Sequence, residues 1–315
     1  MGQRLTSSIS EAGGLLVVSM LAVVVAAAAN QPEFPRLEGP YLGQTPPGTS
    51  PQTFSPDLIS TGAVEACLSF SFDGRFLVFR RGFREDTAIY VMENRNDVWM
   101  EPEPAPFFVK EFGFGDFTFS PNSPELYFTS RRPLVRGGAP TEPANLWKVA
   151  YEGENWLEPV PLGPTVNSEI HDSYPSVSND GTLFFFRRFD AENGLSEIMR
   201  SEVAGEGYGV PKRMPREINT QWDEWDPCIS PDGSFLVFCS KKPSGFGEDD
   251  LYVSFKRRDG SWTEAVNLGD QINSDQSENR PFITADGEYL FFNSNVNGNR
   301  DVFWVDVEAI RMLKP

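Results

Sequence analysis

Apolar and polar residues alternate over short stretches in five segments of the chain, and each stretch ends at a turn of the form [ST]-x-[DN]-[GS]. A short apolar and aromatic run follows every turn. A period of two indicates half-buried β-strands, and a polar step between two such runs indicates a hairpin. The turns are Ser71-Phe72-Asp73-Gly74, Ser120-Pro121-Asn122-Ser123, Ser178-Asn179-Asp180-Gly181, Ser230-Pro231-Asp232-Gly233 and Thr284-Ala285-Asp286-Gly287.

The runs after the turns predict the second strand of each unit, and further strands follow. Second strands are expected at 76–79, 126–128, 183–186, 235–238 and 289–292, and third strands at 88–92, 145–149, 197–201, 250–254 and 301–305. The second-strand runs are rich in β-branched and aromatic residues, which favour strands. A fourth strand is expected to begin near Trp99, Trp156, Tyr208 and Trp262, and the fifth unit lacks it.

Four short antiparallel strands in a unit of about 50 residues are typical of a β-propeller blade. The sequence therefore predicts an all-β propeller of five blades. Six blades remain the alternative, if the Pro-rich segment before the first unit hides a degenerate blade. The last blade needs a fourth strand, because an open sheet edge invites aggregation. The segment Pro51-Gln52-Thr53-Phe54-Ser55-Pro56 resembles the fourth-strand ends of other units and is expected to close the ring.

The N-terminal region has a different character. Residues 1–29 combine a polar start, an apolar stretch and four consecutive alanines, a pattern typical of a secretory signal peptide. An uncleaved membrane anchor is the alternative, although the apolar span is shorter than the roughly 20 residues that cross a bilayer. We expect residues 30–61 to form a Pro-rich lead-in that supplies the closing strand, and residues 62–315 to form the propeller. The expected location is the bacterial periplasm or the medium.

The charge of the chain excludes some partners. Its formal net charge is −18, which opposes binding to nucleic acid or to anionic lipid. His171 is the only histidine, and Cys67, Cys228 and Cys239 have no CxxC spacing. Multi-histidine metal sites and CxxC zinc or redox sites are therefore excluded, and we expect no metal and no cofactor. After signal cleavage the chain is not expected to be an integral membrane protein.

The fourth unit carries the motif Asp226-Pro227-Cys228-Ile229-Ser230-Pro231-Asp232-Gly233, followed by Asp250-Leu251-Tyr252-Val253. This pattern resembles the TolB-like, WD40-like β-propeller repeat, which reads roughly P-x-x-S-P-D-G. The resemblance covers about residues 65–307 and implies a propeller that is exported and serves in binding or scaffolding. The second unit departs from the repeat, because Asn122-Ser123-Pro124 replaces Asp-Gly.

Charged residues recur at one rim of the predicted ring. Acids stand six residues before four of the turns, and basic pairs stand nine to twelve residues after the first residue of four of the turns. Hairpin geometry predicts that Glu65 lies near Arg81 and Asp172 near Arg188. Variable loops between second and third strands emerge on the same rim, where scaffolds commonly carry specificity. The candidate binding residues are Glu65, Arg81, Arg131, His171, Asp172, Arg188, Trp222, Glu224, Trp225, Lys241 and Glu278.

These residues have three interpretations. Cross-strand ion pairs that fix the strand register would account for them without any function. A ring of carboxylates and guanidiniums beside tryptophans would instead bind a polar ligand, either an envelope protein or an extracellular polysaccharide. The third is a carbohydrate-active enzyme, a glycoside hydrolase or a lyase-like propeller, with carboxylates on the inner strands. A basic partner would keep each acid ionised and spoil it as a general acid. We therefore expect a non-catalytic binding module and assign no catalytic residue.

Overall fold

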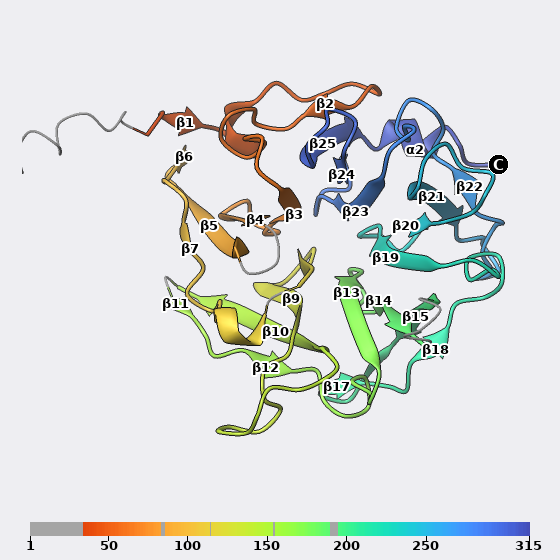
Figure 1. Cartoon of the computed structure of the whole chain (residues 1–315), viewed down its shortest axis with the longest axis horizontal. Coiled ribbons are helices and arrows are strands. Elements are labelled where there is room, and N and C mark those ends of the chain that lie inside the picture. The colour runs from red at the N-terminus through yellow and green to blue at the C-terminus, as the bar shows by residue number, and fades with distance from the viewer. Residues whose placement is uncertain (1–33, 83–85, 114, 154, 190–194) are drawn as a thin grey trace, which may run out of the picture. The chain divides into compact units, whose positions relative to one another are not determined.

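The five repeats fold into five antiparallel sheets arranged in a ring, so the chain is a five-bladed β-propeller (Figure 1). The computed structural model describes residues 34–82, 86–113, 115–153, 155–189 and 195–315, and residues 37–315 form the propeller unit. The predicted five blades are confirmed and the six-blade alternative is wrong. The predicted signal peptide lies outside the described residues.

Each blade has an inner strand, two middle strands and an outer strand. From inside to outside, blade 1 consists of β3 Glu65–Phe70, β4 Phe76–Arg81, β5 Ala88–Arg95 and β7 Glu103–Pro104, and blade 2 of β8 Phe117–Phe119, β9 Glu125–Ser130, β10 Asn145–Glu152 and β12 Val160–Pro161. Blade 3 consists of β13 His171–Val177, β14 Leu183–Arg188, β15 Ser196–Ser201 and β18 Lys212–Arg213, and blade 4 of β19 Glu224–Ile229, β20 Phe235–Ser240, β21 Asp250–Phe255 and β22 Val266–Asn267. Blade 5 consists of β23 Glu278–Ile283, β24 Tyr289–Ser294, β25 Asp301–Asp306 and β2 Gln52–Thr53.

Shorter elements complete the fold. They are strands β1 Leu37–Glu38, β6 Val98–Trp99, β11 Asn155–Trp156, β16 Val203–Ala204 and β17 Gly207–Tyr208, with the helical turns η1 Pro40–Gly43, η3 Lys110–Phe112 and α2 Glu308–Arg311. The aromatic residues expected to begin the fourth strands lie in short arms that precede the outer strands. In blades 1 and 2 this arm pairs with the end of the third strand, and the outer strand then pairs further along it.

The turn motif forms the hairpin turns that the sequence predicts. Ser71 Oγ donates a hydrogen bond to Asp73 Oδ1 at 2.7 Å, and Ser230 does the same to Asp232 at 2.7 Å. The glycine that follows has a φ of +68° at Gly74, a left-handed conformation that glycine adopts without steric cost. The turn of blade 2, although it lacks Asp-Gly, still forms, with Ser120 bonded to Asn122.

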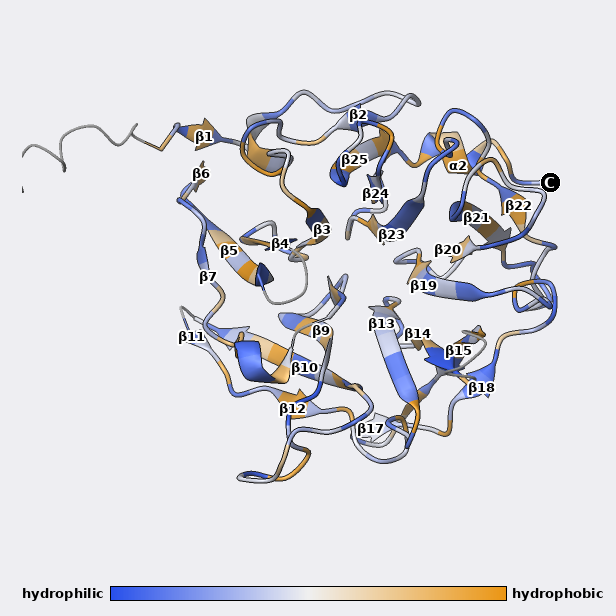
Figure 2. Cartoon of the chain, in the orientation of Figure 1, coloured by the Kyte–Doolittle hydropathy of each residue, from blue (hydrophilic) through white to orange (hydrophobic). Residues whose placement is uncertain are grey.

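Apolar side chains pack between neighbouring blades. Phe76 of blade 1 lies in one cluster with Phe128 and Trp147 of blade 2, and Trp156 contacts Phe76 with ring centroids 5.1 Å apart. Figure 2 shows apolar bands on the middle strands, whereas the inner strands β13 and β23 are largely hydrophilic. The core therefore lies between the blades.

An N-terminal strand closes the ring, as predicted. β2 pairs with β25, with Gln52 opposite Trp304, and Figure 1 shows the two segments beside each other. Phe54 follows β2 and is fully buried against Phe291 and Trp304, with ring centroids 5.0 and 5.2 Å apart. The two chain ends are thereby joined in one sheet. None of the helices in the described ranges is long and apolar enough to span a bilayer.

Candidate functional site

Short connectors join the outer strand of one blade to the inner strand of the next. Each carries an asparagine whose side-chain amide bonds both the N–H and the C=O of one residue in the third strand. The pairs are Asn167 with Leu146, Asn219 with Ile198 and Asn273 with Leu251. The lead-in contains a shorter version, in which Ser60 Oγ bonds the same two groups of Val302. The repeated Val/Ile-Asn-Ser/Thr motif thus fastens each connector to its blade.

The residue that follows each of these three asparagines, or Ser60, donates a hydrogen bond to the acid four positions further along the chain. Ser168, Thr220 and Ser274 each donate a backbone N–H and a hydroxyl to Asp172, Glu224 and Glu278 respectively. The Thr61 hydroxyl donates to Glu65 at 2.6 Å. All four acids have zero exposed area. These carboxylates are therefore buried and hydrogen-bonded to the connectors.

The predicted ion pairs are half correct. Glu65 lies opposite Arg81, with Oε1 3.5 Å from Arg81 Nε. The predicted pairing of Asp172 with Arg188 is wrong: Arg187 lies 2.6 Å from Asp172, and Arg188 lies opposite His171. The turn of blade 3 closes four residues after Ser178, whereas the other turns close after five. A turn one residue shorter moves the register by one and directs Arg188 to a different neighbour.

A bulge in the inner strands turns side chains toward the channel axis. The residue two positions after the buried acid has φ between +49° and +54° at Cys67, Tyr174, Asp226 and Arg280, and Asp116 stands at the corresponding place in blade 2. Bulges commonly redirect a side chain in this way. Asp116 accepts hydrogen bonds from Arg280 Nε at 3.0 Å and from Cys67 Sγ at 3.1 Å, and Arg80 lies 3.8 Å away.

Two adjoining pockets open at the rim where the predicted residues lie. The blade-2 pocket, about 510 Å³, is lined by Arg80, Arg131 and the segment around η3, where blade 2 lacks the buried acid of the other blades. The axial pocket, about 370 Å³, is lined by Asp226, Asp249, Arg188, Lys241 and Arg300. Both include Asp116, His171 and Ser173.

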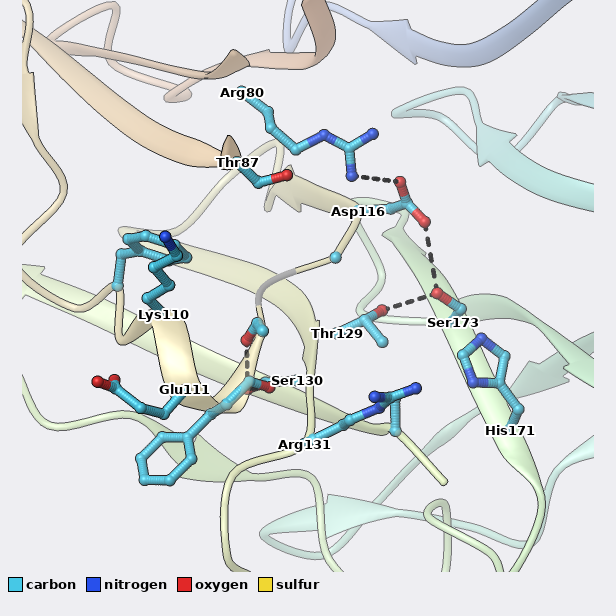
Figure 3. Close-up of a pocket in the computed structure, with 15 residues that line it drawn as sticks. Arg80, Thr87, Lys110, Glu111, Asp116, Thr129, Ser130, Arg131, His171 and Ser173 are labelled. Atoms are coloured by element: carbon cyan, nitrogen blue, oxygen red, sulfur yellow. Dashed lines mark hydrogen bonds and ion pairs between the residues drawn. The ribbon is translucent and has the colours of Figure 1, made fainter. Parts of the chain in front are cut away.

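Figure 3 shows the shared wall of the two pockets. Asp116, Ser173 and Thr129 form a chain of hydrogen bonds, and Arg80 reaches Asp116 from the far side. His171 and Arg131 lie across the pocket from Arg80. At the opposite end of the channel, packed residues such as Phe70 and Phe282 leave a cavity of only about 10 Å³. The large pockets lie at one end of the channel, and side chains fill the other.

The pocket carboxyl groups differ in their affinity for protons. Burial raises the pKa of Asp116, but the guanidiniums of Arg280 and Arg80 lower it further, so this carboxyl stays ionised. Burial and the nearby Asp116 raise the pKa of Asp226 to about 8. Burial also raises the pKa of Asp249. His171 has its pKa lowered by burial and by Arg188, so it is neutral at pH 7.

The structure separates the predicted site residues into two groups. Arg131, His171, Arg188, Trp225 and Lys241 line the pockets. Away from the two pockets lie the acids Glu65, Asp172, Glu224 and Glu278 together with Arg81 and Trp222. Arg81 donates to Leu58 O at 2.6 Å, and Trp222 is 39% exposed.

Sequence reasoning missed several pocket residues: Asp116, Asp226, Asp249, Arg280 and Arg300. One signal was present for three of them, because Asp226 and Arg280 stand two residues after the recurring acid and Asp116 stands at the corresponding place in blade 2. In the described part of the chain, no three His, Cys, Asp or Glu side chains are grouped to hold a metal ion. All three cysteines are buried and unbridged.

Comparisons with known proteins support the fold. No protein-family model and no curated protein matches the chain. Among solved structures, it is similar to a thermostable family-43 glycoside hydrolase, with 12% identity over 76% of this chain and 88% of that one, at a TM-score of 0.51. An α-L-arabinofuranosidase from Lactobacillus brevis matches with 12% identity over 79% and 92%, at a TM-score of 0.50.

TolB from Acinetobacter baumannii is also similar, with 14% identity over 77% of this chain and a TM-score of 0.45. The chain spans about half of that protein, 54% of its length. At these identities the likeness concerns the fold alone.

Proposed function

We propose that the protein is an exported, non-catalytic binding module that holds a polar ligand in the two pockets at the open end of its channel. The bound group is part of an envelope protein or of an extracellular polysaccharide. Export to the periplasm or the medium rests on the pattern of residues 1–29, and N-terminal sequencing of the chain from its host tests it. Recovery of residues 1–29 intact in a membrane fraction would contradict cleavage.

One observation carries the binding proposal: charged side chains from all five blades converge on pockets at one end of the channel, while side chains fill the other end. Both pockets lie within the range of roughly 300–1,000 Å³ typical of small-molecule sites. The loops between second and third strands contribute Thr87 and Asp249. A rigid ring with variable loops at its open end suits specific binding.

A glycan array, an array of peptides and a reducing-sugar assay on the full chain test this function. We expect binding without turnover, and we expect binding to disappear when Arg188 and Lys241 are both changed to Glu. Both side chains are exposed, so the variant should retain its melting temperature within a few degrees. The control is Asp232→Asn at the opposite end, which should leave binding intact. Loss of binding only in the control would place the site at the wrong end.

A carbohydrate-active enzyme is the second candidate, favoured by one observation. Asp226 and Asp249 line the same pocket and both have raised pKa values, and a protonated carboxyl can act as a general acid. Asp116 is a weak candidate for the base, because its two arginine neighbours depress its pKa. Release of reducing ends that is abolished by Asp226→Asn would establish the enzyme and reject the non-catalytic proposal.

A further inference from the structure

Each blade places at least one basic side chain at the open end of the channel. We call five of these residues the cation ring: Arg80, Arg131, Arg188, Lys241 and Arg300, from blades 1 to 5 in order. Four of them belong to the basic pairs of the second strands. Blade 5 has Asn293-Ser294-Asn295 there, and its cation comes from Arg300, next to the start of β25. Blade 5 thus also places a positive charge in the ring, although the residue that carries it comes from a different point in the repeat.

Three members of the ring, Arg80, Arg131 and Lys241, lie within 4.0 Å of the carboxylates of Asp116, Glu142 and Asp249, whereas Arg188 and Arg300 have no such partner in the described residues. Seven basic side chains line the two pockets in the part of the chain that the structure describes, against five carboxyl groups. One of the five, Asp226, has its pKa raised to about 8 and is mostly protonated at pH 7. The formal net charge of the whole chain is −18. A local excess of cations against this background indicates an anionic ligand.

The axial pocket is lined by four basic side chains and four carboxyl groups, and one of these carboxyl groups, Asp226, is mostly protonated at pH 7. Arg80 and Arg280 share Asp116. Burial and the nearby guanidiniums of Arg280 and Arg80 lower the pKa of Arg300. Within the described residues, the Arg300 side chain bonds only the amide oxygen of Asn295, at 3.4 Å, and the Arg188 side chain bonds only the hydroxyl of Ser196, at 3.5 Å. Neither has a carboxylate within 4 Å there. A guanidinium is shaped to bind a carboxylate with two parallel hydrogen bonds.

The rest of the pocket suits a hydroxylated molecule. Asn279 and Ser173 supply donors and acceptors, and the aromatic rings of Phe186 and Trp225 form part of the wall. Trp225 is half-buried, with Lys241 Nζ 5.0 Å from its ring centroid. We propose that the axial pocket binds the carboxylate of a small acidic sugar, with Arg188 and Arg300 as its partners. This inference rests on the proposed binding function and names the class of its ligand.

Calorimetric titration of the full chain with D-galacturonate, D-galactose and malonate tests the proposal. We expect galacturonate to bind at least about tenfold more tightly than galactose, a difference of about 1.4 kcal/mol. It should also bind more tightly than malonate, which has the charge but no ring hydroxyls. Added salt should weaken the binding. The variants Arg188→Gln and Arg300→Gln should each weaken the binding of galacturonate at least about tenfold and leave the affinity for galactose unchanged.

Arg258→Gln is the matched control, because Arg258 is exposed, follows the far end of β21 and lines neither pocket. It should bind galacturonate as the unaltered chain does. Arg188 is exposed, so Arg188→Gln keeps the test valid if Arg300→Gln fails to fold. Equal affinity for galactose and galacturonate would overturn the inference and leave the proposed function standing. Equal affinity for malonate would overturn the sugar assignment. Absence of binding for all three probes would overturn the inference. Absence of binding to every glycan and every peptide on the two arrays would overturn the proposed function.

Discussion

At the scale of single residues, Asp226 is expected to make the fold sensitive to pH. Its ordinary pKa is 3.8, and its pKa in the fold is raised to about 8 by burial and by Asp116. Between these values the folded chain holds a proton that the unfolded chain has released, so the free energy of unfolding falls as pH rises from about 4 to 8. Asp226→Asn removes the titrating group. The stability of this variant relative to the unaltered chain should increase from pH 5 to pH 8.

Urea denaturation at the two pH values measures this difference. Asp270→Asn is the control, because Asp270 is exposed and lines neither pocket. Its difference from the unaltered chain should be the same at both pH values. Parallel pH curves for Asp226→Asn and the unaltered chain would show that Asp226 is ionised in the fold, and would contradict the prediction.

Residue contacts could be predicted only where the turn length was known. The motif spacing placed Glu65 beside Arg81, as the structure has it. The same spacing failed in blade 3, because the turn after Ser178 closes one residue early and brings Arg187 to Asp172. The direction of Asp226 into the channel also escaped prediction. It depends on a left-handed φ of +49°, which side chains other than glycine seldom adopt.

At the scale of elements, the connector between blades 3 and 4 depends on one hydroxyl. Thr220 Oγ1 donates to Glu224 at 2.5 Å, and the Ser240 hydroxyl donates to the same carboxylate oxygen at 3.2 Å. Thr220→Ala removes a hydrogen bond to a buried charge and should cost about 1.5–3 kcal/mol of unfolding free energy. Thr220→Ser keeps the hydroxyl and should cost clearly less. Equal losses in the two variants, measured by denaturant titration, would show that the hydroxyl does not matter.

Much of each element could be predicted from sequence. The expected second strands all lie inside the observed ones, which extend two residues further at their C-terminal ends and, in blade 2, also begin one residue earlier. The basic pairs supply these extra residues in blades 1 and 3 only. The recurring Val/Ile-Asn-Ser/Thr ends were visible in three units, but their role was not, because it depends on amide bonds to a strand about 20 residues away. For the same reason, the sequence pattern placed the four recurring acids at the exposed rim. Their partners are hydroxyls and backbone groups four residues earlier, and this local contact buries them.

At the scale of the whole molecule, the repeat determines the ring, and departures from the repeat determine where it opens. Blade 2 has Gly113 and Gly115 around the position where other blades place a buried acid, and the blade-2 pocket lies there. Period and turn chemistry predicted the number of blades, because every blade must bury its apolar faces against two neighbours. The pockets could not be predicted in this way, since they arise where one unit differs from the rest.

Closure of the ring by β2 leads to the last prediction. Phe54 is fully buried among Phe70, Phe291 and Trp304, so it links the lead-in to blades 1 and 5. Phe54→Ala should lower the free energy of unfolding by about 3–5 kcal/mol, the range for a large buried aromatic side chain. Gln52→Ala is the control, because the Gln52 side chain is exposed while its backbone pairs with Trp304. It should change stability by less than about 0.5 kcal/mol.

Removal of residues 30–61 should have a larger effect than Phe54→Ala, because it also exposes the edge of β25 and the groups of Val302 that Ser60 bonds. Thermal unfolding followed by circular dichroism measures both changes. Light scattering should show aggregation of the truncated chain, since an uncovered strand edge pairs with other chains. A truncated chain that stays monomeric and melts at the temperature of the intact chain would show that the ring does not depend on β2. In that case the pairing of β2 with β25 would contribute little to the stability of the propeller.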